Sequence, residues 1–408
     1  MRSQKSLKAG LAATGVALSL AVAGPAAAQV SDDVVRIGVL NDMSSLYSDI
    51  NGPGGVLAAK MAVEDAGGSV LGKKIEVVSG DVQNKPDVAV AIAGRWFDAD
   101  KVDLIIGGGG SASSLATSRV AADKNRIYIG TDPATSDLTG KACTPTTIHW
   151  VYDTIALANG TGSAVVKSGG KDWYFLTADY AFGHSLERDV TAVVTANGGK
   201  VVGSVRHPLN TQDFSSFLLQ AQSSKAQIIG LANAGGDTIN SIKQAAEFGI
   251  GQGGQSLAGL LVFVSDIHSI GLKLAQGLKL TESFYWDLND GTRTFSKRWG
   301  DQMNGRKPTM IQAGYYSAIK HYLEAIKAVG TDDTTKVMEW LKSNPLNDDL
   351  FGKGYVRKDG RKIHDMYLFE VKKPEESKGA WDYYKLIRSI PGEEAFRPMD
   401  QGGCPLVK

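Results

Sequence analysis

The chain has 408 residues, of which 43% are hydrophobic and 21% are charged, so it can bury a large core and lacks the composition typical of disorder. Its formal net charge is +1, which gives no electrostatic reason to expect a nucleic-acid partner. The length predicts about two or three domains.

Residues 1–28 have the pattern of a secretory signal peptide. Three basic residues within the first eight precede an apolar stretch that ends in Ala26-Ala27-Ala28. The stretch is rich in Ala and Gly and shorter than the roughly 20 strongly apolar residues of a membrane span. We therefore expect cleavage after Ala28 and export of a protein with 41 basic and 43 acidic residues, a formal net charge of −2.

The mature sequence opens with alternating strand-like and helix-like segments. Short runs rich in β-branched residues, separated by helical patterns, are typical of βαβ units with a parallel sheet. The predicted strands are 34–40, 73–81, 102–108 and 126–131, and the predicted helices are 54–68, 86–100 and 111–125.

The same pattern restarts after residue 170. The predicted strands are 171–179, 200–208, 227–233 and 257–266, and the predicted helices are 185–199, 213–226, 237–250 and 270–277. The sequence therefore predicts two successive doubly wound α/β halves, similar in pattern but without a visible sequence repeat.

The pattern changes after residue 280. Helices are predicted over 292–305, 308–330 and 332–345, followed by a strand–turn–strand over 355–373 and a strand over 381–390. Asp359-Gly360 is a hairpin signal within the strand–turn–strand. The three helices fit as the completion of the first half, and the terminal strands as the completion of the second.

The chain contains two cysteines, Cys143 and Cys404. An even count in an oxidising compartment favours one disulfide over two isolated thiols. Two cysteines are too few for a thiolate metal cage, and the six histidines show no metal-ligand spacing. A nucleophile elbow is also missing from the sequence, so we expect no metal, no cofactor and no enzyme.

The stretch "VDLIIGGGGSASSLA" (102–116) is a predicted strand that ends in glycines just before a helix. Glycines allow a tight turn and close approach of a ligand, and Ser111 can cap the helix and leave N–H groups for an anion. A plain cap and turn without a ligand explains these residues equally well. The residues do not have the spacing of a dinucleotide-binding fingerprint or of a P-loop, so a small carboxylate is the best remaining ligand for this stretch.

Other predicted strand ends carry further candidates, because open parallel sheets bind ligands at the carboxyl ends of their strands. Tyr47 follows the first strand, Thr135 lies in the loop "DPATS", and Tyr180 and Phe182 precede a helix of the second half. Each fits an ordinary loop or packing role as well. Asp266 ends a predicted strand, where it can cap a helix or hold a ligand ammonium.

The ordered series "IGVLNDMSSLYSDINGPGGVLAAKMAVEDAGG", "DVQNKPDVAVAIAGRW", "HWVYDT", "TADYAFG" and "NAGGDTINSIKQAAEFGI" resembles the periplasmic substrate-binding proteins of ABC importers, of the branched-chain amino-acid-binding, type I kind. The resemblance spans nearly the whole mature chain. It implies two Rossmann-like lobes joined by three crossovers, near 148–153, 281–287 and 352–357. Lobe 1 would comprise 29–149 plus 284–354, and lobe 2 would comprise 150–283 plus 355–408.

The resemblance also implies a ligand site between the lobes. Ser111, beside Gly110, matches the family's serine that binds the ligand carboxylate. The second carboxylate-binding position falls on Ala134 when the alignment is counted back from Leu138-Thr139, and on Thr135 when the Ala-Thr pair is matched. The lobe aromatics map onto Tyr47 and Phe182, with Tyr180 beside it, and the ammonium-binding acid maps onto Asp266. Further expected contacts are Trp150, Ala234 and Tyr285.

The implied function is capture of a small carboxylate by closure of the lobes, in the periplasm, and delivery to ABC permease subunits of the inner membrane by a monomeric protein. The ligand is a branched-chain or other amino acid, or an aromatic or other organic acid. Two alternatives remain: a ligand-sensing receptor of the same fold, and a nucleotide-using α/β enzyme.

Overall fold

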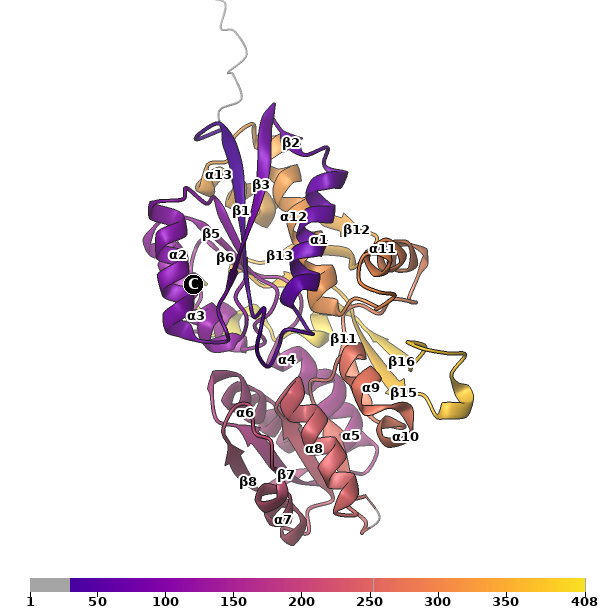
Figure 1. The fold of residues 1–408 in the computed structure, drawn as a ribbon. Helices are drawn as coiled ribbons and strands as arrows, with labels where there is room; N and C mark the ends of the chain where they lie inside the picture. The colour runs from indigo at the N-terminus through magenta and orange to yellow at the C-terminus, as the bar shows by residue number, and fades with distance from the viewer. Residues whose placement is uncertain (1–29, 252, 408) are drawn as a thin grey trace, which may run out of the picture.

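The computed structural model describes residues 30–251 and 253–407 (Figure 1). The predicted signal peptide, residues 1–28, lies outside the described residues. Two parallel sheets, one above the other in Figure 1, form the centres of the upper and lower parts of the molecule. None of the helices in the described part of the chain is long and apolar enough to cross a membrane.

The first sheet has six strands in the order β2-β3-β1-β4-β5-β6, parallel except for the β2–β3 pair. Side chains alternate along β1, since Ile37 packs in the core on one face while a Cβ at Gly38 would collide with the Trp96 ring on the other. The strands are β1 (Val34–Asn41), β2 (Ser69–Val70), β3 (Lys73–Asp81), β4 (Leu104–Gly107), β5 (Ile127–Gly130) and β6 (Thr147–His149).

Helices cover both faces of this sheet, and some come from late in the chain (Figure 1). On one face α2 packs on α3, and on the other α1 packs on α12, as the predicted completion of the first half requires. The helices are α1 (Gly52–Asp65), α2 (Pro86–Asp98), α3 (Ser111–Asp123), the 3-10 turn η1 (Ser136–Thr139), α11 (Asp290–Asp301), α12 (Met310–Val329) and α13 (Thr334–Ser343).

The second sheet is parallel, with the order β10-β9-β7-β8. Its strands are β7 (Asp172–Ala178), β8 (Lys200–His207), β9 (Ile228–Ala232) and β10 (Ser256–Gly259). Its helices are α4 (Thr154–Leu157), which continues through the π-helical turn η2 (Ala158–Gly162) into α5 (Ser163–Lys167), then α6 (Ala181–Ala196), α7 (Ser215–Ser223), α8 (Gly236–Glu247), α9 (Val264–Ile270) and α10 (Leu272–Ala275).

Two small antiparallel sheets complete the fold, β11-β15-β16 and β12-β13-β14. Their elements, with the terminal turns, are β11 (Lys279–Glu282), β12 (Leu346–Asp348), β13 (Gly352–Val356), β14 (Lys362–Ile363), β15 (Met366–Val371), η3 (Pro374–Glu376), β16 (Tyr384–Ile390), α14 (Gly392–Ala395) and η4 (Met399–Gln401). The hairpin predicted around Asp359-Gly360 is the β13–β14 pair, while β15 belongs to the other small sheet.

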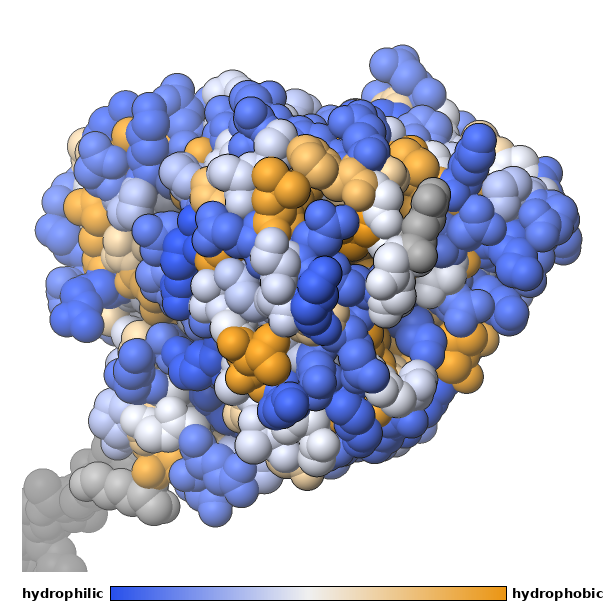
Figure 2. Space-filling model, turned by 90° about the horizontal axis from the view of Figure 1, so that it is seen from below, coloured by the Kyte–Doolittle hydropathy of each residue, from blue (hydrophilic) through white to orange (hydrophobic). Residues whose placement is uncertain are grey.

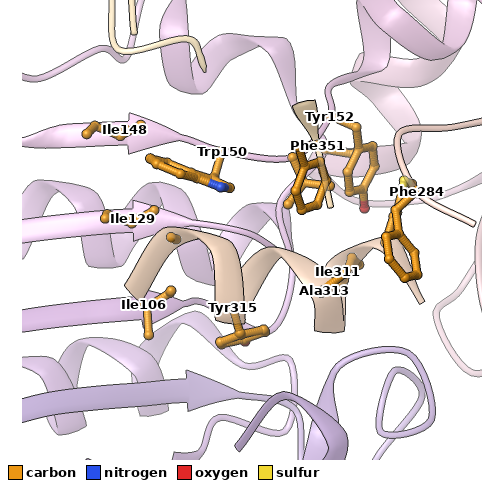
Figure 3. Packing of buried hydrophobic residues seen from close by; sticks show 14 of the residues in the cluster. Ile106, Ile129, Ile148, Trp150, Tyr152, Phe284, Ile311, Ala313, Tyr315 and Phe351 are labelled. Atoms are coloured by element: carbon orange, nitrogen blue, oxygen red, sulfur yellow. The ribbon is translucent and has the colours of Figure 1, made fainter. Parts of the chain in front are cut away.

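The core of the first sheet continues toward the second. Figure 3 shows Ile106, Ile129 and Ile148 in a row on the adjacent strands β4, β5 and β6, with Tyr315 of α12 beside Ile106. Further along α12, Ile311 reaches the region of Tyr152, beyond the end of β6. Helix α12, from the later part of the chain, therefore belongs to the core of the first sheet and also reaches the region beyond the end of β6.

The face of the molecule seen in Figure 2 is mainly hydrophilic. Figure 2, which views the molecule from below, shows apolar spots separated by polar residues. The few large hydrophobic side chains that are exposed come from scattered elements of the described chain, as Val90, Leu219 and Leu386 illustrate. Single exposed hydrophobic residues of this kind are normal on a protein surface.

One predicted strand is wrong. The run 257–266 was expected to be one strand, but β10 ends at Gly259 and α9 begins at Val264. The intervening residues 260–263 are buried without joining a sheet, because a short apolar run can fill a core from a loop as well as from a strand. Asp266 consequently lies in the first turn of a helix.

Cys143 and Cys404 form a disulfide, with their Cα atoms 5.6 Å apart. The bridge joins the loop after η1 to the C-terminal tail across 261 residues of sequence. The Arg397 guanidinium adds a hydrogen bond of 2.7 Å to the Ser136 carbonyl. The tail is thereby fastened beside the first sheet.

Candidate functional site

A cavity of about 310 Å³, measured with its opening, lies where the carboxyl ends of strands from the two sheets face each other. Loops after β1, β4 and β5 contribute one side, and loops after β7, β9 and β10 contribute the other. The lining residues are Tyr47, Ile50, Asn51, Gly109, Gly110, Ser111, Asp132, Ala134, Tyr152, Tyr180, Phe182, Ala234, Leu261, Phe263 and Ile311.

The turn after β4 requires glycine. Gly107, Gly108 and Gly109 have φ values of +104°, +120° and +74°. A Cβ at Gly107 would collide with the Tyr315 hydroxyl, and one at Gly108 with the Tyr128 hydroxyl. Three successive residues with positive φ and tyrosine hydroxyls packed against the backbone leave no room for side chains. The glycines thus bring the backbone to the cavity.

This turn holds an internal carboxylate. Asp132 Oδ2 accepts hydrogen bonds from the Gly109 N–H (2.7 Å), the Tyr315 hydroxyl (2.9 Å) and the Asn51 amide (3.2 Å). Its Oδ1 accepts one from the Thr131 hydroxyl (2.9 Å). Burial is the main cause that raises the pKa of Asp132 to about 7.

Ser111 lies next to that carboxylate, at the first position of α3. Its Oγ accepts hydrogen bonds from the backbone N–H groups of Ala134 and Thr135, both at 3.2 Å. The expected side-chain cap of α3 is absent, because Gly110 is the N-cap residue and makes no side-chain hydrogen bond. The N-cap therefore supplies no side-chain acceptor to the first-turn N–H groups of the 13-residue helix, and the residues at its start, Gly110 and Ser111, line the cavity.

Five aromatic side chains also line the cavity. The Tyr47 hydroxyl, from the loop after β1, is hydrogen-bonded to the Tyr180 hydroxyl, from the loop after β7. Phe182 packs beside Tyr180, with ring centroids 5.9 Å apart, and Phe263 makes an edge contact with Tyr152. Burial raises the pKa of Tyr47 and Tyr180, so both phenols are neutral near pH 7.

Residues 34–380 match the family described as periplasmic binding protein. The chain belongs to this family. A periplasmic binding protein from Burkholderia mallei is 54% identical, with 92% of this chain and 100% of that chain covered, at a TM-score of 0.90.

Two further solved structures show the same type I fold. A branched chain amino acid ABC transporter periplasmic ligand-binding protein from Burkholderia xenovorans LB400 is 41% identical, with 92% of this chain and 100% of that chain covered, at a TM-score of 0.82. A solute-binding protein of an ABC transporter from R. palustris, in complex with 4-hydroxybenzoate, is 22% identical over 88% of this chain and 98% of that chain, at a TM-score of 0.79. At that identity the last match concerns the fold alone.

The structure of this periplasmic binding protein brings together many of the residues expected at the site. Those that line the cavity are Tyr47, Gly110, Ser111, Ala134, Tyr180, Phe182 and Ala234. Of the two alternatives after β5, Ala134 lines the cavity. Thr135 points away from it, because its Oγ1 is hydrogen-bonded to Ser185 Oγ at 2.7 Å and accepts the Asp137 N–H within η1.

Trp150 and Tyr285 are core residues that do not line the cavity. The Trp150 indole donates to Ser317 Oγ of α12 at 3.0 Å, so α12 covers the ring. The Tyr285 ring stacks on Tyr384 with centroids 4.7 Å apart, and its hydroxyl donates to the Trp381 carbonyl at 2.8 Å. Both aromatic residues were expected at the cleft because they flank crossovers. Instead, Trp150 contacts α12 and Tyr285 contacts β16.

Asp266 also lies outside the cavity lining. Its carboxylate accepts the Phe263 N–H at 2.9 Å, which caps the start of α9. It lines instead a separate polar depression at the rim, together with Asp49 and Ser265. In this structure Asp266 has the helix-capping role that the sequence had offered as its alternative, and its role as the partner of a ligand ammonium stays a prediction.

Sequence reasoning missed several lining residues. They are Ile50, Asn51, Gly109, Asp132, Tyr152, Leu261, Phe263 and Ile311. Asp132 carried a usable signal, since it is an acid that directly follows a buried strand. Ile311 carried none, because it reaches the cavity only through the packing of α12 against the first sheet.

None of the residues that line the cavity is Lys, Arg or His. In the ranges 30–251 and 253–407, no group of three or more His, Cys, Asp or Glu is placed to hold a metal ion. The polar groups of the cavity lining are thus N–H groups, O–H groups and one acid, Asp132.

Proposed function

We propose that this protein is the ligand receptor of an ABC importer and that it binds a small carboxylic acid with an apolar body in the cavity between its two lobes. The observation that supports this most directly is the polarity of the cavity. Its lining combines the Ser111 hydroxyl and the backbone at the start of α3 with the aromatic rings of Tyr180 and Phe182.

The ligand carboxylate would lie at the start of α3. Backbone N–H groups at a helix N-terminus and a serine hydroxyl are good donors to an anion. Ser111 Oγ already accepts two N–H groups, so its own proton is available to donate to a ligand oxygen. Ala134 N–H would then share its hydrogen bond between Ser111 and the ligand.

The body of the ligand would lie against the rings. Tyr180, Phe182 and Phe263 form a wall that suits a benzene ring or a short branched chain. Burial of such a body contributes about 25 cal/mol per Å² of apolar surface.

An acid without an amino group fits this cavity best. Asp132 is the one acid in the lining, and its Oδ2 already accepts three hydrogen bonds. Asp266, the other candidate for an ammonium, is occupied in capping α9. Amino acids remain the second candidate, because the relative from Burkholderia xenovorans is named as a branched chain amino acid ligand-binding protein.

Capture would occur by closure of the lobes. The Tyr47–Tyr180 hydrogen bond joins a loop of the first sheet to a loop of the second over the cavity. Ligand contacts made only in the closed state shift the population toward it, and inner-membrane permease subunits would then receive the ligand from the closed form. The protein would act as a monomer in the periplasm, after cleavage behind Ala28.

We retain the proposed division into lobes, 29–149 plus 284–354 and 150–283 plus 355–408. The first boundary coincides with the end of β6 at His149. The boundary at 355 falls inside β13, and β13 pairs with β14, so this crossover would include the whole β13–β14 hairpin.

A thermal-shift comparison tests the proposed function. Benzoate, 4-hydroxybenzoate, 4-methylpentanoate, leucine and valine are each added to the purified protein, with benzamide as a neutral match to benzoate. We expect an acid to raise the melting temperature and benzamide to leave it unchanged, because binding stabilises by mass action. No shift with any carboxylate, or tight retention of NAD or ATP, would overturn the proposal in favour of the enzyme alternative.

A further inference from the structure

Asp132 is an acid inside a cavity that offers it no cationic partner. It is 6% exposed and lines the cavity beside Gly110 and Ser111. The donors to its carboxylate are neutral groups of four different segments: Thr131 at the end of β5, Gly109 in the turn before α3, Asn51 before α1 and Tyr315 on α12.

The other titratable groups near Asp132 do not compensate its charge. The Tyr152 hydroxyl, after β6, donates to the Asp132 backbone carbonyl at 3.1 Å, and Tyr128 of β5 faces it from the sheet. Asp42, after β1, is a second acid, which raises the pKa of Asp132 further. Each of these neighbours is neutral or anionic, so an added anion meets no cationic side chain in the cavity lining.

The carboxylate of the proposed ligand would lie against Gly110 and Ser111, the two residues that follow Gly109 in the chain. Gly109 donates to Asp132, while Gly110 and Ser111 face the ligand carboxylate. Two carboxylates in one buried site without a cation do not both remain ionised, because each raises the pKa of the other.

We propose that Asp132 and the carboxylate of the bound ligand share one proton, so that ligand binding takes up a proton from solvent. This inference rests on the proposed function. The balance is simple: an ionised Asp132, a ligand anion and one proton from the buffer form a complex in which a single negative charge is divided between two carboxyl groups. Asp132 would therefore select monocarboxylates and exclude dianions.

The pH dependence follows from the state of Asp132 in the free protein. Burial raises its pKa to about 7, so the acid is mostly protonated near pH 5.5 and mostly ionised near pH 8. Proton uptake on binding should be close to zero at the lower pH and greater than about half a proton at the higher one. Above about pH 8 the affinity should fall by up to tenfold per pH unit.

Titration calorimetry in buffers of different ionisation enthalpy counts the protons. The probe is whichever of benzoate, 4-hydroxybenzoate and 4-methylpentanoate gives the largest thermal shift. We expect uptake near pH 8 by the unaltered protein and uptake close to zero for Asp132→Asn. The matched control is Asp103→Asn: burial raises the pKa of Asp103 to about 6, but this acid precedes β4 and lies outside the cavity lining, so proton uptake should be unchanged.

The outcomes separate the two proposals. Acid binding without proton uptake by the unaltered protein would overturn the shared proton and leave the proposed function standing. Failure of the three acids and also of leucine and valine to bind would overturn both. If Asp132→Asn does not fold, the proton count on the unaltered protein still decides.

Discussion

Ser111 is the residue on which the proposed recognition of a carboxylate depends. Ser111→Ala removes the hydroxyl and leaves the N–H groups of Ala134 and Thr135 without their present acceptor. We expect the binding free energy of the acid to weaken by roughly 1–3 kcal/mol, the range for a hydrogen bond to a charged group.

The control for this change is Ser118→Ala, on the same helix. The Ser118 hydroxyl is bonded to the Leu115 carbonyl and lies outside the cavity lining, so its removal should leave binding unchanged. Titration calorimetry of both variants decides, and equal affinities for the two would show that Ser111 is only a structural residue.

The raised pKa of Asp132 also predicts how the free energy of unfolding depends on pH in the absence of ligand. Its folded-state pKa is raised to about 7, so the folded protein holds this proton more tightly than the unfolded chain does. The stabilisation this proton gives is full below the unfolded pKa and is lost as pH rises through about 7. From pH 5 to pH 7 the free energy of unfolding should fall by roughly 2 kcal/mol relative to Asp132→Asn. Urea unfolding at each pH measures it, and parallel curves for the two proteins would contradict the raised pKa.

Single site residues could be predicted from the sequence only where the local pattern around them was clear. Ser111, Ala134 and Tyr180 could be predicted because each follows a strand whose pattern was clear. Asp266 was misplaced because the apolar run before it ends as a buried loop and a helix start. Ile311 had no local signal at all, since only long-range packing brings it to the cavity.

Among the elements, α12 connects the late part of the chain to the site. Tyr315 of α12 donates its hydroxyl to Asp132 across the first sheet, while the next residue, Tyr316, donates to Asp65 at a partly exposed position. Tyr315→Phe should lower the free energy of unfolding by roughly 1–3 kcal/mol, because the buried Asp132 loses a donor.

Tyr316→Phe is the matched control, and we expect it to cost less than about 1 kcal/mol because its partner Asp65 also receives the Arg298 guanidinium. Chemical denaturation compares the two. Equal losses would contradict the view that α12 supports the site through Asp132.

The order of elements was largely predictable, since strand and helix periodicities alternate clearly over residues 34–250. The placement of the later elements needed the structure. Their own patterns do not specify that α12 packs on α1 or that β15 lies between β11 and β16.

On the scale of the whole molecule, the Cys143–Cys404 disulfide closes a segment of 261 residues. The C-terminal tail is held beside η1 by this bridge and by Arg397. Loss of a native disulfide typically costs about 2–5 kcal/mol, mainly through the entropy of the unfolded chain.

The Cys143→Ser/Cys404→Ser variant should therefore unfold at a lower denaturant concentration than the oxidised protein. Reductant should lower the midpoint of the unaltered protein to that of the variant and leave the variant unchanged. A reductant-insensitive midpoint in the unaltered protein would show that the bridge does not contribute.

The protein has the type I fold of the periplasmic binding proteins, and the proposed function puts the ligand in the cavity between its two parallel sheets. A crystal structure with the acid that gives the largest thermal shift tests this account most directly. We predict a carboxylate oxygen within hydrogen-bond distance of Ser111 Oγ and the Ala134 N–H, with the ligand body against Tyr180 and Phe182. A ligand bound with its carboxylate away from Ser111, or outside this cavity, would contradict the account.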